Sequence, residues 1–138
     1  MNEVFADTSG WANFFVRTEP HHVPTTSLMT QWQQQGRCVV TTNYVLSELV
    51  ALLTSPLSAS RSTVLRHIEA IRSVHWVEIV HIDPSLDAAA WKLLTERLDK
   101  KWSLVDCASF VVMERRSLTD ALTADRHFEQ AGFVRLLG

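Results

Sequence analysis

The sequence Val4-Phe5-Ala6-Asp7-Thr8-Ser9-Gly10-Trp11 runs from three apolar residues into an aspartate and then into small residues that favour the start of a helix. The pattern predicts a short buried strand over residues 3–7 and a helix over residues 8–16. In α/β proteins the ligand site lies at the carboxyl ends of the strands, so Asp7 is a candidate catalytic or metal-binding carboxylate. The structural alternative is that Asp7 only caps the helix, because Asp is a preferred N-cap residue.

The remainder of the chain repeats this alternation of short apolar strands and longer helices. Residues 18–26, which contain two prolines, are predicted to form a loop. Further strands are expected over 37–41, 76–80, 120–124 and 133–136. Further helices are expected over 27–35 (ended by Gly36), 43–54, from Ser58 or Ser60 through Ile71, from Asp83 through Leu98, from Ser103 to about Arg116, and as a turn at 126–131.

The linkers between the predicted strands are too long for hairpins, which indicates a parallel sheet covered by helices on both faces. The expected fold is therefore α/β, a three-layer α/β/α sandwich with a mostly parallel central sheet. The chain has 138 residues and 46% hydrophobic residues, which suits one domain over residues 1–138 with a substantial core.

Composition restricts the class of function. The net charge is −2, which argues against a generally basic nucleic-acid binder, although eleven of the thirteen basic residues follow residue 60 and could form a local basic rim. No signal peptide is apparent, and no apolar run approaches the ~20 residues that span a bilayer. Cys38 and Cys107 lack zinc-type spacing and are expected to be small buried hydrophobes in a reducing cytosol. We therefore expect a cytoplasmic protein without membrane contact.

Three more acids attract attention. Glu48 is the only charge in Tyr44–Leu53 and falls on the apolar face of its helix, where a carboxylate is costly unless it is paired or binds a cation. Its alternative role is at the edge of that face, reaching water. Asp106 stands three residues after Ser103, a spacing typical of a capping box. Asp125 follows an apolar strand and could cap the next helical turn.

The carboxyl ends of parallel strands share one edge of a sheet, so these four acids can converge there. Converging carboxylates repel one another at low dielectric unless some are protonated or divalent cations neutralise them. An all-oxygen ligand set without cysteine or clustered histidine suits Mg²⁺ or Mn²⁺. Such ions promote phosphodiester cleavage, and they would let an acidic site accept a polyanion.

The order and spacing of four segments resemble those of the PIN domain family, and within it the VapC-type toxin nucleases and their stand-alone relatives. The likeness covers essentially the whole chain. It implies an α/β/α sandwich and a Mg²⁺/Mn²⁺-dependent ribonuclease. The four segments are Phe5-Ala6-Asp7-Thr8-Ser9-Gly10-Trp11, Ser47-Glu48, Trp102-Ser103-Leu104-Val105-Asp106-Cys107 and Leu122-Thr123-Ala124-Asp125-Arg126-His127-Phe128.

The resemblance also assigns roles to individual residues and implies partners. Asp7, Asp106 and Asp125 would hold the ion, and Glu48 would be a further ligand or a base for the attacking water. The supporting hydroxyls would be those of Thr8, Ser9 and Thr123. Toxin members of the family usually form homodimers and are held by a cognate antitoxin protein, so RNA, a second copy and an antitoxin are the implied partners.

Several neighbouring residues keep two interpretations. Arg97, Lys100 and Lys101 are candidates for contact with the RNA backbone, or they form a solvated helix end. Trp11 and Trp102 flank motif acids and could stack on bases, but core packing is favoured. Asp120, at the start of a strand, is expected to be structural.

Rival functional classes are a non-catalytic PIN-like module that acts through protein or RNA contacts, and a phosphatase or receiver-like domain. A receiver domain needs an acidic pair before its first phosphorylatable aspartate and a lysine at a late strand end, but no lysine follows Lys101. A haloacid-type phosphatase needs a second aspartate two residues after Asp7, where Ser9 stands. The nuclease interpretation fits best.

Overall fold

The computed structural model describes residues 3–138, which form a five-stranded sheet in the order β3-β2-β1-β4-β5. Each neighbouring pair of strands is parallel. Along the chain the elements are β1 (Glu3–Ala6), α1 (Thr8–Phe15), α2 (His22–Gln35), β2 (Cys38–Thr42), α3 (Asn43–Thr54), α4 (Arg61–Ser73), β3 (Val77–Val80), α5 (Pro84–Glu96), α6 (Leu104–Arg115), β4 (Asp120–Leu122), α7 (Arg126–Gln130) and β5 (Val134–Arg135). The predicted α/β class and parallel sheet are confirmed.

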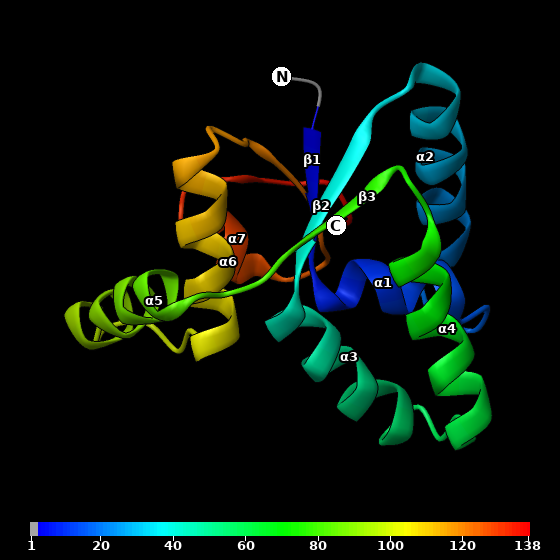
Figure 1. The fold of residues 1–138 in the computed structure, drawn as a ribbon, viewed down its shortest axis with the longest axis horizontal. Coiled ribbons are helices and arrows are strands. Elements are labelled where there is room, and N and C mark those ends of the chain that lie inside the picture. Colours follow the sequence, from blue (N-terminus) through cyan, green and yellow to red (C-terminus); the bar gives the residue numbers. More distant parts are fainter. Residues whose placement is uncertain (1–2) are drawn as a thin grey trace.

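Helices cover both faces of the sheet (Figure 1). Helices α6 and α7 lie on one side, with α5 packed outside α6, whereas α1, α2 and α4 lie on the other. Helix α3 lies near the carboxyl ends of the strands and contacts both α1 and α6. The three layers of the predicted sandwich are therefore present.

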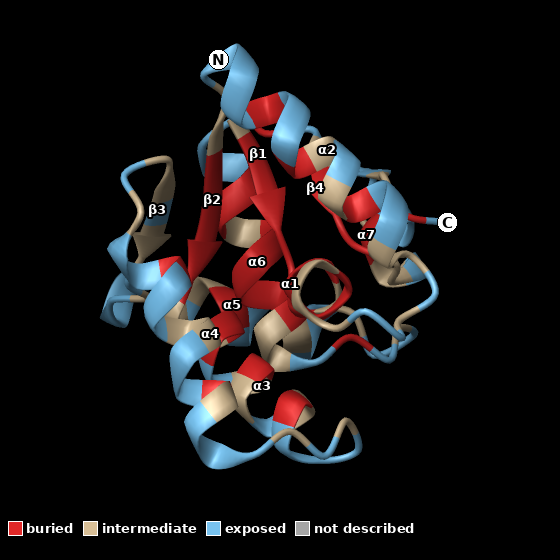
Figure 2. Ribbon diagram, turned by 90° about the vertical axis from the view of Figure 1, so that its right-hand side faces the viewer, coloured by how far each residue is buried: buried red, intermediate tan, exposed pale blue. Residues whose placement is uncertain are grey.

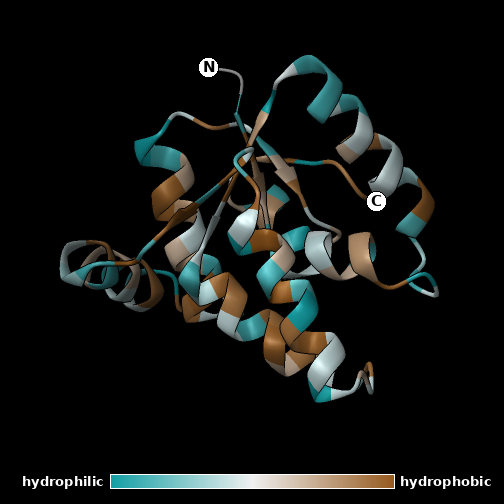
Figure 3. Cartoon of the chain, turned by 45° about the vertical axis from the view of Figure 1, so that its right-hand side comes forward, coloured by the Kyte–Doolittle hydropathy of each residue, from teal (hydrophilic) through white to brown (hydrophobic). Residues whose placement is uncertain are grey.

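The core follows from this layering. Strands β1 and β2 are buried on both sides (Figure 2), which is why their residues form continuous apolar runs instead of alternating with polar ones. Helix α6 is also largely buried. By contrast, α2 carries hydrophilic residues along much of its length (Figure 3) and buries only Thr25, Met29 and Trp32. Among residues 3–138, no helix has the length and apolar character to cross a membrane.

Local capping signals correctly located most helix ends. The side chains of Thr42, Ser60, Asp83 and Ser103 each accept a hydrogen bond from a backbone amide in the first turn of the following helix. Gly36 ends α2 in the left-handed conformation with φ of 70°, where glycine carries no Cβ penalty.

Two predictions of helix bounds are wrong, and Cys38, which was expected to be buried, is only half-buried. The predicted loop over 18–26 is helical from His22 onward, because Pro24 falls in the first turn, where a missing backbone N–H breaks no helical hydrogen bond. Asn13 fixes the entry to this helix by accepting from the His21 amide at 2.8 Å. Helix α5 ends at Glu96, so Leu98 is not one of its core positions and is 88% exposed.

The strand order places a switch point between β1 and β4. From β1 the chain moves outward to β2 on one side, whereas from β4 it moves outward to β5 on the other. The chain therefore leaves these two strands in opposite directions, and in open α/β sheets ligands bind at the carboxyl ends of the strands beside such a switch point. Asp7 directly follows β1, and Thr123 directly follows β4, so the candidate residues stand at the position where α/β folds bind ligands.

Gly10 allows α1 to approach the end of β4. A Cβ at this position would lie 2.1 Å from the Leu122 carbonyl oxygen, which also accepts the Asp7 amide at 3.2 Å. Since the obstacle is backbone, Gly10→Ala should destabilise the protein by about 3 kcal/mol. Urea unfolding would measure this loss. Gly36→Ala has open space but positive φ and should cost only about 1 kcal/mol, so equal losses for the two variants would contradict the steric argument.

Candidate metal-dependent active site

Asp7 occupies the N-cap position of α1, but its side chain makes no capping hydrogen bond. It is only 3% exposed. Its Oδ2 accepts a hydrogen bond from Thr123 Oγ1 at 3.1 Å, whereas its Oδ1 is buried without a hydrogen-bond partner among residues 3–138. Burial raises the pKa of Asp7 to about 8; the charges of Asp106 and Glu48 add to this rise, whereas the Thr8 amide and the Thr123 hydroxyl oppose it. The helix-cap alternative therefore does not explain this side chain.

Glu48 reaches the same region from the middle of α3. Its Oε1 accepts a hydrogen bond from the Thr8 hydroxyl, which ties α3 to the start of α1. Burial raises the pKa of Glu48; the Thr8 hydrogen bond opposes this rise, and the charges of Asp106 and Asp125 add to it. The side chain is thus half-buried and within electrostatic range of the other acids, and it does not simply extend into water.

Asp106 has two structural roles at once. It forms the predicted capping box of α6: its amide donates to Ser103 Oγ, and its Oδ2 accepts from the Ser103 amide, both at 3.0 Å. The same Oδ2 lies 2.9 Å from Nδ1 of His127. The capping interpretation of the sequence is therefore correct, and the carboxylate nevertheless faces the cluster of acids.

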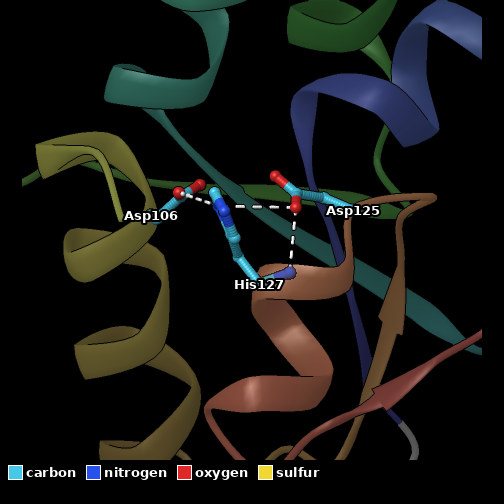
Figure 4. Close-up of side chains that lie close together, drawn as sticks. All are labelled: Asp106, Asp125 and His127. Carbon is cyan, nitrogen blue, oxygen red and sulfur yellow. Dashed lines mark hydrogen bonds and ion pairs between the residues drawn. The ribbon is translucent and has the colours of Figure 1, made fainter. Parts of the chain in front are cut away.

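Asp125 and His127 complete the cluster from the start of α7 (Figure 4). Asp125 Oδ1 accepts the His127 amide at 2.9 Å, which caps the helix, and lies 3.4 Å from His127 Nδ1. One ligand atom from each of Asp106, Asp125 and His127 lies within 4.8 Å of the others. His127 was not among the candidate site residues identified from the sequence. Its position two residues after Asp125, in the first turn of a helix, was the available signal.

Hydroxyl groups connect the two central strands beneath the acids. Thr123 Oγ1 donates to Asp7, lies 3.1 Å from Ser9 Oγ and accepts the Asp125 amide at 3.0 Å. Ser9 Oγ also accepts the Ala124 amide at 2.9 Å. These contacts join the β1–α1 junction to the β4–α7 junction, so the spacing between Asp7 and Asp125 depends on two small side chains.

Thr123→Val should separate these two junctions while preserving side-chain shape. The change removes the donor to Asp7 and the acceptor for the Asp125 amide, so we expect a loss of about 1–3 kcal/mol in the free energy of unfolding. Chemical denaturation would measure the loss. Thr54→Val is the matched control, because that exposed hydroxyl donates to the Val50 carbonyl of its own helix and has no other hydrogen bond among residues 3–138. A similar loss in both variants would contradict a role for the network.

The arrangement is suited to a divalent cation. The negative charges of the acids act on one another: Asp7 is coupled to Asp106 and Glu48, and Glu48 is coupled to Asp106 and Asp125. A buried carboxylate oxygen without a donor is costly unless something positive lies beside it. Two carboxylates and one imidazole have ligand atoms within 4.8 Å of one another, and they are appropriate ligands for a hard or borderline divalent ion. The residues present therefore fit a metal site.

The predicted basic residues lie between the end of α5 and the start of α6, and two of them are paired with an acid. Both Arg97 and Lys100 pair with Asp99, at 3.0 and 3.8 Å, and the Arg97 guanidinium lies over the Trp102 ring. Lys101 is exposed, two residues before the first residue of the Asp106 capping box.

Three other candidates belong to the scaffold. Trp11 and Trp102 are buried in the core, which confirms the packing interpretation and rules out base stacking in this conformation. Asp120 pairs with Arg37 at 3.1 Å at the amino end of β4, so its structural role is also confirmed.

The fold and this acidic cluster define an α/β/α domain with a carboxylate site of the metal-binding type at the switch point of its sheet. The chain belongs to the PIN domain family, whose pattern it matches over residues 4–134.

Among characterised relatives, it is 32% identical over 133 residues to the 23S rRNA-specific endonuclease VapC20 of Mycobacterium tuberculosis, covering 96% of this chain and 97% of that protein. The crystal structure of M. tuberculosis VapC20, described as a sarcin-ricin loop cleaving toxin, superposes with a TM-score of 0.85 at 29% identity, covering 96% of this chain and 98% of that one.

More distant structures share the fold. VapBC2 from Rickettsia felis, solved bound to a DNA fragment from its promoter, gives a TM-score of 0.67 at 12% identity over 96% of each chain. FitAcB from Neisseria gonorrhoeae gives a TM-score of 0.66 at 16% identity, covering 98% of this chain and 96% of that one.

Proposed function

We propose that this protein is a Mg²⁺- or Mn²⁺-dependent endoribonuclease that acts as the toxin of a toxin–antitoxin pair. The observation that carries the proposal is Oδ1 of Asp7, which is buried, has no hydrogen-bond partner among residues 3–138 and is electrostatically coupled to Asp106 and Glu48. A buried carboxylate oxygen in that position can bind a cation, and burying its charge costs free energy when no cation is bound. The likeness to an endonuclease specific for 23S rRNA over 96% of the chain supports RNA as the substrate.

In this proposal Asp7, Asp106 and Asp125 hold the cation. A divalent ion held by these residues would supply Lewis-acid activation of water and positive charge for the scissile phosphate. Thr123 and Ser103 orient two of the carboxylates through the hydrogen bonds described above. Glu48, held by Thr8 and with a raised pKa, is placed to act as a ligand or to accept the proton of the attacking water.

RNA would approach from the side of α7 and the loop before α6. Asp125 and His127 are the more exposed members of the cluster, with side-chain exposures of 35% and 29%, whereas Asp7 forms the buried floor. Lys101, which forms no ion pair within the described part of the chain, provides a positive charge on the loop that precedes Asp106. Arg97 and Lys100 could transfer from Asp99 to phosphate oxygens. These cations would offset the repulsion between the acidic rim and the RNA backbone.

The same proposal includes one nuclease domain over residues 1–138, a cytoplasmic location, a homodimer and a cognate antitoxin protein. Its support is the family and the likeness to a VapC toxin over nearly the full length of both chains. The antitoxin would have to limit access of RNA to the acidic cluster, since that cluster is the part of the chain that would carry the chemistry.

Cleavage of a ribosomal RNA fragment tests the proposal. Wild-type protein should cleave the fragment with Mg²⁺ or Mn²⁺, lose activity in EDTA and regain it when the metal is returned. Asp106→Asn should lose most of the activity and stay folded, because the asparagine oxygen can still accept the Ser103 amide. If wild type cleaves equally well in EDTA, or if Asp106→Asn cleaves normally, the metal site is misassigned. If no RNA is cleaved but RNA binds, a non-catalytic binding module is the better description.

A further inference from the structure

The imidazole of His127 stands among carboxylates in a position typical of a ligand. Its Nδ1 lies 2.9 Å from Asp106 Oδ2 and 3.4 Å from Asp125 Oδ1. Figure 4 shows the ring between the two acids, with the nitrogen turned toward both. The three residues come from two helix starts that are brought together at the same edge of the sheet, so the sequence separation of Asp106 and His127 gives no hint of this contact.

The spacing of these atoms matches a shared metal ion. Adjacent ligands of an octahedral ion with bonds of about 2.1 Å are separated by about 3.0 Å. The two distances from His127 Nδ1, at 2.9 and 3.4 Å, are close to that value. All three ligand atoms lie within 4.8 Å of one another, which leaves room for opposite as well as adjacent positions around an ion.

A second feature points to an ion at the same place. Asp7, which is 3% exposed, is electrostatically coupled to Asp106 of this group, and one of its carboxylate oxygens has no hydrogen-bond partner in the described chain. The charge of Asp106 acts on it directly. A buried carboxylate oxygen of this kind is costly unless a positive charge lies beside it, which favours a cation among these acids.

The position of the ring is fixed by the fold. The His127 amide donates to Asp125, and the next residue, Phe128, is fully buried with its ring against Phe5 and Phe110. The backbone of His127, which carries the imidazole, is therefore held by contacts on both sides of this residue. A ligand held in place in this way loses little conformational freedom when it binds a metal.

We propose that His127 Nδ1 is a ligand of the active-site cation together with Asp106 and Asp125, and that this nitrogen makes the site select Mn²⁺ over Mg²⁺. The inference rests on the proposed function, because it takes the acidic cluster to be a divalent metal site. Mg²⁺ demands oxygen ligands, whereas imidazole is an accepted ligand of first-row transition ions. The choice of metal would then depend on one histidine and not on the carboxylates alone.

Metal binding by the full chain without an affinity tag tests this assignment. Calorimetry with Mn²⁺ and with Mg²⁺ should show at least tenfold tighter binding of Mn²⁺ to wild type. His127→Gln should weaken Mn²⁺ binding by about ten- to a hundredfold and Mg²⁺ binding by less than threefold. His75→Gln, which replaces an exposed histidine at the amino-end side of the sheet, should change neither affinity. Pulsed electron paramagnetic resonance of bound Mn²⁺ should show coupling to one ¹⁴N nucleus in wild type and none in His127→Gln.

Two results would overturn the assignment in different ways. If Mn²⁺ binds wild type without nitrogen coupling, or if His127→Gln weakens both ions equally, His127 only positions the carboxylates and the proposed nuclease survives. If neither ion binds wild type, the metal site itself is wrong and the proposed function fails with it. The resonance measurement on wild type remains decisive even if the variant folds poorly.

Discussion

Asp7→Asn is expected to abolish RNA cleavage and at the same time to raise the melting temperature of the metal-free protein. Activity should fall by about a hundred- to a thousandfold, the usual scale for losing one central electrostatic group. The melting temperature should rise at pH 8 because asparagine cannot ionise. In wild type, burial and the charges of Asp106 and Glu48 disfavour the ionised form of Asp7. Asparagine can still accept the Thr123 hydroxyl, so the connection between the two strands is kept.

Cleavage assays and calorimetric melts of the same preparations would measure both effects. Asp120→Asn is the matched control: it also removes an acid from the chain, but one that pairs with Arg37. It should cleave RNA normally and melt slightly lower than wild type. A purely structural Asp7 would give the reverse pattern, in which Asp7→Asn loses stability and keeps its activity.

The metal-free protein should become less stable as the pH rises from about 4 to about 8. The pKa of Asp7 is about 8 in the folded protein against an ordinary value of 3.8. Between these values the folded state holds a proton that the unfolded state has released, so the free energy of unfolding falls by up to about 1.4 kcal/mol per pH unit. The raised pKa of Glu48 adds a change of the same sign. Above pH 8 the contribution of Asp7 is fully lost.

Divalent metal should reverse this trend. Binding requires the ionised carboxylate, so Mn²⁺ should displace the Asp7 proton and bind more tightly as the pH rises toward 8. Urea unfolding from pH 5 to pH 9 in EDTA and in excess Mn²⁺ would provide both curves. We expect them to diverge with rising pH in wild type, and Asp7→Asn should show a flatter EDTA curve and a smaller response to Mn²⁺. Parallel curves in wild type would mean that Asp7 does not face a cation site.

Much of the fold could be predicted because its signals are local. A capping side chain and the amide it accepts are separated by three residues, as in Ser103 and Asp106, and a buried parallel strand such as β1 is a short apolar run. Such features depend on neighbouring residues and survive in any arrangement of the elements. Errors arose where a local rule has an exception: Pro24 is compatible with a first helical turn, and the apolar Leu98 lies beyond the helix end.

The positions of the four acids were visible in the sequence as well, because Asp7 and Asp125 follow apolar strands, Asp106 opens a helix and Glu48 interrupts an apolar face. Each nevertheless had a structural alternative of its own. Asp106 and Asp125 both cap a helix and also belong to the acidic cluster. The local sequence pattern alone therefore could not show whether each residue was a helix cap or a site residue.

Only the tertiary structure decided which of these groups meet. Ser9 and Thr123 are 114 residues apart and lie 3.1 Å from one another, and Glu48 reaches Thr8 across forty residues. His127 was overlooked because a lone histidine becomes a candidate ligand only when another element brings carboxylates to it. The sequence determined the strands, helices and acids of this protein through neighbour interactions. The order of strands in the sheet follows from the packing of distant segments. It determined that Oδ1 of Asp7 is buried without a hydrogen-bond partner among residues 3–138 and that the His127 imidazole meets Asp106 and Asp125.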